Sequence, residues 1–260
     1  MGTPRTDWAA IPRDAGHRPW PLPARPWVMT MSWQDLLFAH WPLDPGAIAP
    51  HLPAGLVLDT FDGQAWLSVV PFRMADVGAR WLPRLPGVSA FPELNIRTYV
   101  VADGKPGVWF FSLDAASRLA VWGARTFFHM PYFHAAMHCT PGGGDSVAYQ
   151  SRRTDDRLGP GELVARYWPT GAVFHSAPGT LDHWLTERYC LYGADRHGHL
   201  YRGDVHHARW PLQAAGADIA VNTVADAHGL GDLGPPERLH FARRLDVVAW
   251  WQVRVGPASG

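Results

Sequence analysis

Short runs in which apolar and polar side chains alternate occur along much of the chain, and turns rich in glycine, proline or aspartate separate them. Alternation with a period of two is typical of strands that bury one face. The dipeptides Asp62-Gly63 and Asp103-Gly104 suit tight turns, so each predicts a β-hairpin. Expected strands cover residues 27–33, 56–61, 65–72, 94–102, 108–113, 131–139, 146–153, 163–167, 172–174 and 247–255.

Helical signals are fewer and shorter. Asp44 followed by Pro45 predicts an N-capped helix over 45–52, and Thr180 caps a helix that reaches about residue 191. A further helix is expected over 115–123. Hairpins outnumber helices, and strands do not alternate with helices. This favours an antiparallel, β-rich α+β fold, closed into one barrel or two packed sheets, with a few short flanking helices.

The N-terminal region has a different character. Residues 1–26 contain six prolines and little periodicity, so we interpret them as an extended arm that packs on the body through Trp8 and Trp20. A length of 260 residues permits one large domain or two small ones. We expect residues 27–260 to form a single domain.

Composition excludes several classes of protein. Hydrophobic residues make up 47% and charged residues 18%, which is enough for a large core and argues against disorder. The formal net charge is zero, so neither nucleic acid nor an anionic membrane is an expected partner. Two cysteines exclude a disulfide scaffold. Because no secretory signal and no apolar run of about 20 residues is present, a cytoplasmic protein is expected.

Two predicted strands carry polar side chains in register. Glu93, Asn95 and Arg97 share one face of the strand that follows Pro92, which predicts either a solvated edge or the wall of a cavity. On the later strand, Tyr132 and His134 alternate with a clearly apolar face that includes Phe133 and Met137. The Tyr132 face is expected to meet solvent or a polar cavity.

Other residues allow two interpretations. Arg125 is placed either to satisfy the carbonyls at a helix end or to bind a carboxylate through its planar guanidinium. Among 14 histidines, His134 and His138 are spaced to share one face, but no third metal ligand lies nearby in the sequence. No metal and no cofactor are therefore predicted.

Several sequence segments together resemble the YqjF-like or DUF2071 proteins. They are Phe38-Ala39-His40-Trp41, Leu52-Pro53-Ala54-Gly55-Leu56, Asp62-Gly63-Gln64-Ala65-Trp66-Leu67, Glu93-Leu94-Asn95-Ile96-Arg97-Thr98-Tyr99-Val100, Phe111-Ser112-Leu113-Asp114-Ala115 and Leu185-Thr186-Glu187-Arg188-Tyr189. The resemblance covers about residues 27–215. It implies the acetoacetate decarboxylase-like fold, a curved antiparallel barrel or cone with a central cavity.

The same resemblance argues against the decarboxylase reaction. The decarboxylases carry Leu-Asp, a short helix, an arginine and then Pro-Lys-Lys, whose first lysine forms the Schiff base. Here Arg125 is followed at the matching distance by Pro131, but the next residue is Tyr132. Lys105 is the only lysine among the 23 basic residues, and it falls in a predicted turn. A tyrosine hydroxyl cannot form an imine. Glu93, or alternatively Asn95, is the counterpart of a glutamate on the preceding strand of the decarboxylases.

We therefore expect a protein with a small-molecule pocket. Glu93 and Tyr132 are the candidate groups for acid–base chemistry, without a Schiff base, on a small carboxylate or carbonyl compound. The side chains expected to bind the ligand are those of Arg125, Arg97, Asn95 and His134. One alternative is a non-catalytic binding or interaction module on the same fold, and another is a histidine-based metal enzyme. The expected partner is a small-molecule ligand, and a homo-oligomer is compatible with the sequence.

Overall fold

The computed structural model describes residues 6–81 and 89–256. The strands are β1 (Met29–Leu43), β2 (Val57–Leu58), β3 (Ala65–Ala79), β4 (Phe91–Ala102), β5 (Lys105–Ala115), β6 (Tyr132–Pro141), β7 (Val147–Arg153), β8 (Glu162–Pro169), β9 (Cys190–Ala194), β10 (Leu200–His207), β11 (Gln213–Asn222), β12 (Arg238–Ala249) and β13 (Val253–Arg254). The α-helices are α1 (Pro45–Ile48), α2 (Arg118–Phe128) and α3 (Leu181–Thr186). Short 3-10 helices are η1 (Ile11–Arg13), η2 (Ala49–His51) and η3 (Asp226–His228).

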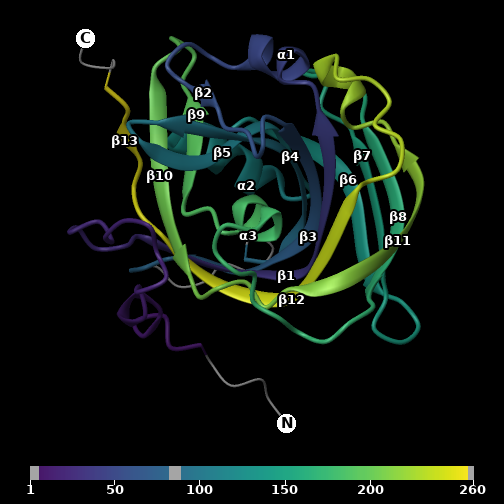
Figure 1. Cartoon of the computed structure of the whole chain (residues 1–260), viewed down its shortest axis with the longest axis horizontal. Helices are drawn as coiled ribbons and strands as arrows, with labels where there is room; N and C mark the ends of the chain where they lie inside the picture. The colour runs from purple at the N-terminus through teal and green to yellow at the C-terminus, as the bar shows by residue number, and fades with distance from the viewer. Residues whose placement is uncertain (1–5, 82–88, 257–260) are drawn as a thin grey trace.

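All the described strands join one curved sheet, in the order β13-β10-β9-β5-β6-β7-β8-β11-β12-β1-β3-β4-β2. Two additional pairings, β10–β12 and β5–β4, close this sheet into two rings that share β12, β1, β3, β4 and β5 (Figure 1). The ring completed by β9 and β10 is called the cavity ring below. The ring completed by β6, β7, β8 and β11 is called the packed ring. The β-rich α+β fold class is confirmed.

Two of the strand pairings are parallel, unlike the antiparallel arrangement expected from the hairpin pattern. Leu113 of β5 pairs with Tyr132 of β6, and Val108 of β5 pairs with Leu191 of β9. Helix α2 makes the connection between β5 and β6. It begins later and ends later than expected, because the Ser117 side chain caps its first turn by accepting from the Ala120 amide. His129 ends it in a left-handed conformation with a φ of 47°.

The two predicted hairpins have different outcomes. Asp103 and Gly104 have φ angles of 49° and 68°, and they join β4 to β5 as an antiparallel pair, as expected. Asp62-Gly63 also turns, but the preceding strand β2 pairs with β4 rather than with β3. Both edges of β3 are already occupied by β1 and β4, so β2 has no edge of β3 to join.

The remaining helix predictions are partly confirmed. The helix expected over 45–52 is present as α1 followed by η2, with the Asp44 side chain accepting from the Gly46 amide at 2.6 Å. Thr180 caps α3 by accepting from the His183 amide at 3.3 Å. That helix ends at Thr186, well before residue 191, because the chain there turns into β9 and joins the cavity ring.

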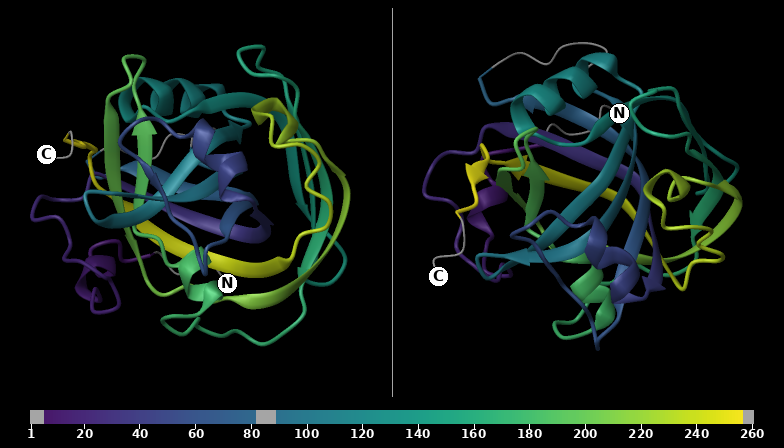
Figure 2. Two further views of the ribbon diagram at one scale, coloured as in Figure 1. Left: turned by 45° about the horizontal axis from the view of Figure 1, so that its top comes forward. Right: turned by 90° about the horizontal axis from the view of Figure 1, so that it is seen from above.

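The N-terminal segment lies outside the rings, beside β10 and β12 (Figures 1 and 2). The Trp20 side chain packs against the buried cluster that includes Leu56 and Tyr192. Arg18 is buried, and its guanidinium donates to the Val205 carbonyl at 2.5 Å. The segment is therefore held to the body by packing of Trp20, by the buried Arg18 and by further hydrogen bonds, such as the one from Nε2 of His17 to the His207 carbonyl at 2.8 Å.

The main apolar core lies inside the packed ring. Leu94 and Ile96 of β4 pack there with residues from β6, β7 and β8, such as Met137, Tyr149 and Tyr167. The predicted apolar face of β6 is buried at Phe133, Ala135 and Met137, and the last two of these belong to this core. The opposite face of β4 is directed into the cavity ring.

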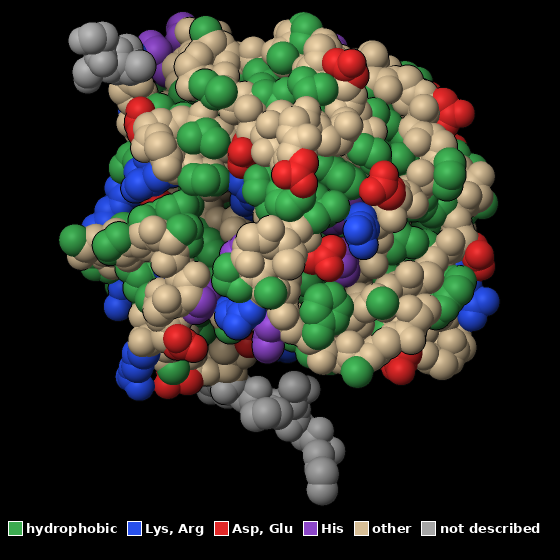
Figure 3. All heavy atoms as spheres, in the orientation of Figure 1, with side chains coloured by type: hydrophobic (Ala, Val, Ile, Leu, Met, Phe, Trp, Pro, Cys, Tyr) green, Lys and Arg blue, Asp and Glu red, His purple; other side chains and the backbone are tan. Residues whose placement is uncertain are grey.

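Among the described residues, no helix is long and apolar enough to cross a membrane. On the face shown in Figure 3, acidic and basic side chains are scattered among hydrophobic ones without separating into areas of one charge. This distribution agrees with the formal net charge of zero.

Candidate active site

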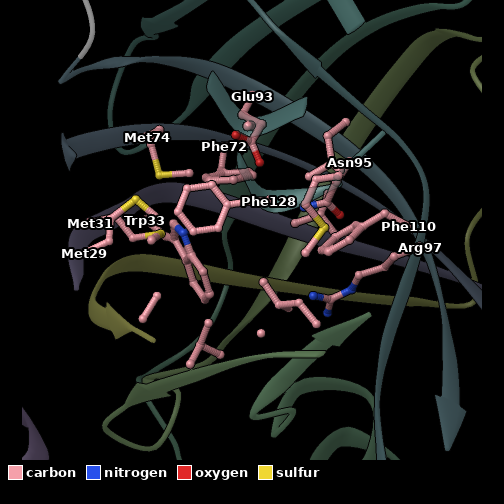
Figure 4. A pocket seen from close by; sticks show the side chains of 18 of the residues that line it. Met29, Met31, Trp33, Phe72, Met74, Glu93, Asn95, Arg97, Phe110 and Phe128 are labelled. Atoms are coloured by element: carbon pink, nitrogen blue, oxygen red, sulfur yellow. The ribbon is translucent and has the colours of Figure 1, made fainter. Parts of the chain in front are cut away.

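The cavity ring encloses a cavity of about 130 Å³ (Figure 4). Strands β1, β3, β4, β5, β9, β10 and β12 line it, together with the end of α2 and the first residue of β6. Most of the lining side chains are methionine, leucine, phenylalanine or tryptophan. A few polar side chains interrupt this apolar surface, and half of these come from one strand.

Strand β4 supplies a row of polar side chains to the cavity. Glu93, Asn95 and Arg97 point into it from alternate positions and are only 2%, 6% and 9% exposed (Figure 4). The intervening Leu94 and Ile96 point into the packed ring. Of the two alternatives for this strand, the structure therefore shows the cavity wall and not the solvated edge.

Glu93 and Tyr132 form the central pair of the site. The Tyr132 hydroxyl donates to Oε2 of Glu93 at 2.9 Å. Burial raises the pKa of Glu93 to about 8, although the hydrogen bond from Tyr132 lowers it in part. Burial and the neighbouring Glu93 also raise the pKa of Tyr132 well above its usual range. At neutral pH Glu93 therefore carries a proton, and a small change in its surroundings would release that proton.

A second tyrosine, Tyr149, bonds to the backbone of Glu93. The Tyr149 hydroxyl, which lies in the core of the packed ring, donates to the Glu93 carbonyl at 2.6 Å. Tyr149 is fully buried, so this contact is not exchanged with solvent. The Glu93 carboxyl is thus presented to the cavity by a hydrogen bond from the opposite side of the sheet.

Several buried polar atoms of the cavity wall have no hydrogen-bond partner within the described residues. They are Oδ1 of Asn95, Nε of Arg97, Nε1 of Trp210 and Oε1 of Gln252. Arg97 makes one long hydrogen bond, from Nη2 to the Leu185 carbonyl at 3.4 Å, and its guanidinium lies 5.1 Å from the Phe38 ring centre. Buried polar groups are normally bonded, so these atoms are available to a polar ligand.

The structure does not bring Arg125 into this cavity. Its Nη1 donates to the backbone carbonyl of Tyr132 at 2.9 Å, and its guanidinium lies 5.4 Å from the Phe133 ring centre. Arg125 instead borders two more open pockets on the outside of α2. It sits in the last turn of the helix rather than beyond its end, and this places it on the outer side of the β6 backbone.

His134 also lies outside the cavity. Its Nδ1 is 2.8 Å from Oγ1 of Thr154, and its backbone amide donates to Asp155 at 3.1 Å. Strand β6 belongs to the packed ring and borders the cavity only at its start, where residues 132–134 pair with β5. From Ala135 onward it pairs with β7. The face that Tyr132 directs into the cavity is therefore outside it from His134 onward.

Sequence reasoning missed the apolar part of the site. Met29, Met31 and Trp33 line the cavity from alternate positions of β1, and Met74 does so from β3. Their alternation is visible in the sequence, but it does not distinguish a cavity wall from a filled core. Asp204 of β10 was also missed. Its carboxylate lies 3.9 Å from Arg18 and 3.5 Å from Arg202.

The described residues place neither a cluster of metal ligands nor a lysine side chain in this cavity. Among residues 6–81 and 89–256, no group of three or more potential metal ligands is found. Lys105 is the first residue of β5, and its ammonium lies 5.7 Å from the Trp20 ring centre, away from the cavity wall.

Comparison with solved structures defines the fold class. The enduracididine biosynthesis enzyme MppR, complexed with pyruvate, superimposes with a TM-score of 0.61 at 13% identity and covers 92% of this chain and 93% of that chain. Acetoacetate decarboxylase from Legionella pneumophila superimposes with a TM-score of 0.62 at 12% identity and full coverage of both chains (100% and 100%). The chain therefore has the acetoacetate decarboxylase-like fold.

Sequence comparison defines the family within that fold. The chain belongs to the DUF2071 family, described as uncharacterized conserved proteins, whose sequence profile matches residues 30–246. It is 50% identical over 224 residues to the uncharacterized protein YqjF of Bacillus subtilis strain 168, an alignment that covers 86% of this chain and 91% of YqjF. The resemblance seen in the sequence motifs is thereby confirmed.

Proposed function

We propose that the chain binds a small oxo acid in this cavity and that Glu93 transfers a proton at the carbon next to the carbonyl group. The Glu93–Tyr132 pair carries the proposal, because a carboxyl that is 2% exposed faces a cavity and is bonded to a phenol at 2.9 Å. With a pKa of about 8, Glu93 has both its acid and its base form available near neutral pH.

The proposed step balances without an oxidant or a covalent bond to the protein. The Glu93 carboxylate takes a proton from the carbon beside the carbonyl. The C–H electron pair becomes the C=C bond of an enolate, and the carbonyl π pair moves to the oxygen. The Tyr132 hydroxyl is the donor available to that oxygen, and the proton on Glu93 then returns to carbon.

Arg97 and Asn95 supply the binding half of the proposal. A guanidinium satisfies both oxygens of a carboxylate at once, and Nε of Arg97 has no partner among the described residues. The fold neighbour MppR is described in complex with pyruvate, a 2-oxo acid, which supports this class of ligand. Arg125 and His134 are assigned no ligand contact, because they do not line the cavity.

Hydrogen–deuterium exchange at carbon tests the proposal. The protein is incubated with 2-oxobutanoate in D₂O, and loss of the C3 proton signal is followed by NMR. Because the base form is needed, the protein-dependent rate rises about tenfold per pH unit up to pH 8 and levels off above it. Glu93→Gln lowers the rate by about 10²–10⁴-fold, and Tyr132→Phe moves the inflection to higher pH, because Tyr132 stabilises the ionised form of Glu93.

Arg73→Gln provides a matched control, since Arg73 is exposed on β3 next to the residues that line the cavity. It should exchange at the wild-type rate. Binding of 2-oxobutanoate without exchange would contradict the proposal and favour a non-catalytic ligand-binding module.

A further inference from the structure

The two ends of the cavity differ in chemistry. Figure 4 shows Met29, Met31, Trp33 and Met74 on one side, Glu93 between, and Asn95 and Arg97 on the other side. The first four residues are called the methionine end below. The polar residues stand in the order Glu93, Asn95, Arg97 along one strand, so distance from the methionine end increases along that row.

The methionine end is an organised surface. Trp33 and Met74 are directly opposite each other in the β1–β3 ladder, and the Trp33 ring stacks on Trp210 with a centre distance of 5.6 Å. Met31 and Met74 are 7% and 6% exposed. Methionine side chains are flexible and polarizable, so they adapt to an alkyl group of irregular shape.

From this order of groups we infer that the substrate is a 2-oxo monocarboxylic acid with a branched alkyl chain. In such a molecule the alkyl chain, the exchangeable carbon, the carbonyl and the carboxylate follow one another. Along the cavity the methionine end comes first. The Glu93–Tyr132 pair, which serves the exchangeable carbon and its carbonyl, comes next, and Arg97 comes last. The inference rests on the proposed function and adds the identity of the group that fills the methionine end.

Cavity size narrows the class. A cavity of about 130 Å³ is slightly smaller than the roughly 150 Å³ cavity that holds one benzene ring in an engineered protein. Pyruvate would leave the methionine end unfilled, and phenylpyruvate adds a whole ring to the oxo acid and exceeds the space. A short branched chain, as in 4-methyl-2-oxopentanoate, lies between these limits.

The methionine end also disfavours a second carboxylate. Arg97, the cationic side chain of the cavity wall, lies at the other end. A carboxylate placed among Met29, Met31, Trp33 and Met74 would lose its water without gaining an ion pair. A dicarboxylate such as 2-oxoglutarate, which is similar in size to 4-methyl-2-oxopentanoate, should therefore bind poorly.

Calorimetric titration of a series of acids tests the inference on the wild-type protein. The series is pyruvate, 2-oxobutanoate, 3-methyl-2-oxobutanoate and 4-methyl-2-oxopentanoate, with phenylpyruvate and 2-oxoglutarate as comparisons. Each added carbon should tighten Kd about three- to fourfold, the transfer free energy of one methylene. The two comparison acids should bind about tenfold more weakly than 4-methyl-2-oxopentanoate. A Kd independent of chain length, or tightest binding of 2-oxoglutarate, would overturn the inference.

Variants locate the effect and separate it from the proposed reaction. Met31→Phe fills the methionine end and should abolish the dependence of Kd on chain length. Met137→Phe makes the same change in the packed ring, so it should keep the dependence of Kd on chain length. Thermal melting checks that each variant is folded. Glu93→Gln should keep the dependence while losing exchange. Exchange with no dependence on chain length therefore refutes only the inference, and the dependence without exchange refutes only the proposed reaction.

Discussion

The two faces of β4 show how one strand serves two different environments. Leu94 and Ile96, each 1% exposed, pack into the apolar core of the packed ring. Glu93, Asn95 and Arg97 are almost as deeply buried, yet they border a cavity, and Asn95 and Arg97 retain polar atoms without partners among the described residues. Burial alone therefore does not distinguish core from site. On β4 the distinction is that Glu93, Asn95 and Arg97 face a space that a ligand can enter, whereas Leu94 and Ile96 face other side chains.

The two faces of β4 have opposite effects on the stability of the fold. Apolar side chains in the packed ring stabilise the fold through transfer and close packing. Unpartnered polar atoms in the cavity ring reduce stability, because they lose water without gaining a bond. Strand β4 therefore stabilises the fold through one face and reduces stability through the other. This combination is typical of a binding site carried by a rigid scaffold.

The largest expected effect concerns the charge state of Glu93. Its pKa rises from an ordinary value of 4.5 to about 8, so between these pH values the folded protein holds a proton that the unfolded chain has released. The free energy of unfolding is therefore highest, as far as Glu93 is concerned, below pH 4.5. It falls by about 5 kcal/mol as the pH rises from 4.5 to 8. Glu93→Gln removes this loss, which urea denaturation between pH 4.5 and 9 will measure.

The difference between wild type and Glu93→Gln is the quantity to compare. Partly buried histidines such as His228, whose pKa burial lowers to about 4, change stability in the opposite direction and are present in both proteins. Equal pH profiles for the two proteins would show that Glu93 is ionised and solvated, and would remove the basis of the proposed function.

Substitutions on the two opposite faces of β4 should give the next largest change in the free energy of unfolding. Leu94→Ala should lower the free energy of unfolding by about 2–5 kcal/mol, because it creates a cavity in a packed core. Asn95→Leu should raise it by about 1–3 kcal/mol, because it removes a buried oxygen that has no partner. Denaturant titration of both variants checks the contrast. A loss of stability in Asn95→Leu would mean that the Asn95 amide is satisfied.

The last prediction is a negative one: no covalent adduct should form with a lysine in the cavity. Lys105 lies on β5 beside Trp20 and away from the cavity wall. Borohydride treatment with acetoacetate should therefore trap no imine in the cavity, as measured by intact-protein mass spectrometry. A stoichiometric adduct that Lys105→Arg abolishes would restore the Schiff-base mechanism.

Much of the fold was predictable because its signals are local. Alternation located most of the strands, Asp103-Gly104 specified the β4–β5 hairpin, and Asp44 and Thr180 marked the starts of α1 and α3. The β4 row was predictable for the same reason, since a period of two fixes which side chains share a face. Whether that face meets water or a cavity depends on which strands pack around it, and this is not a local property.

The remaining features depend on long-range pairing. His134 was expected to accompany Tyr132, but β6 borders the cavity only at Tyr132, its first residue. Arg125 was expected near the ligand, but α2 continues through Phe128 and carries it to the outer side of β6. The Met29, Met31 and Trp33 wall was missed because apolar side chains look the same in a sequence whether their neighbours fill the space or leave it open.

The closure of the cavity ring by the β10–β12 pairing affects both the synthesis and the degradation of the protein. Met29 near the start of the described chain and Gln252 near its end line the same cavity. During synthesis the site is therefore complete only after β9, β10 and β12 have emerged, and a nascent or C-terminally clipped chain lacks it. A bound ligand in turn ties the first strand to the last long one, so it opposes release of either terminus by proteases as well as global unfolding.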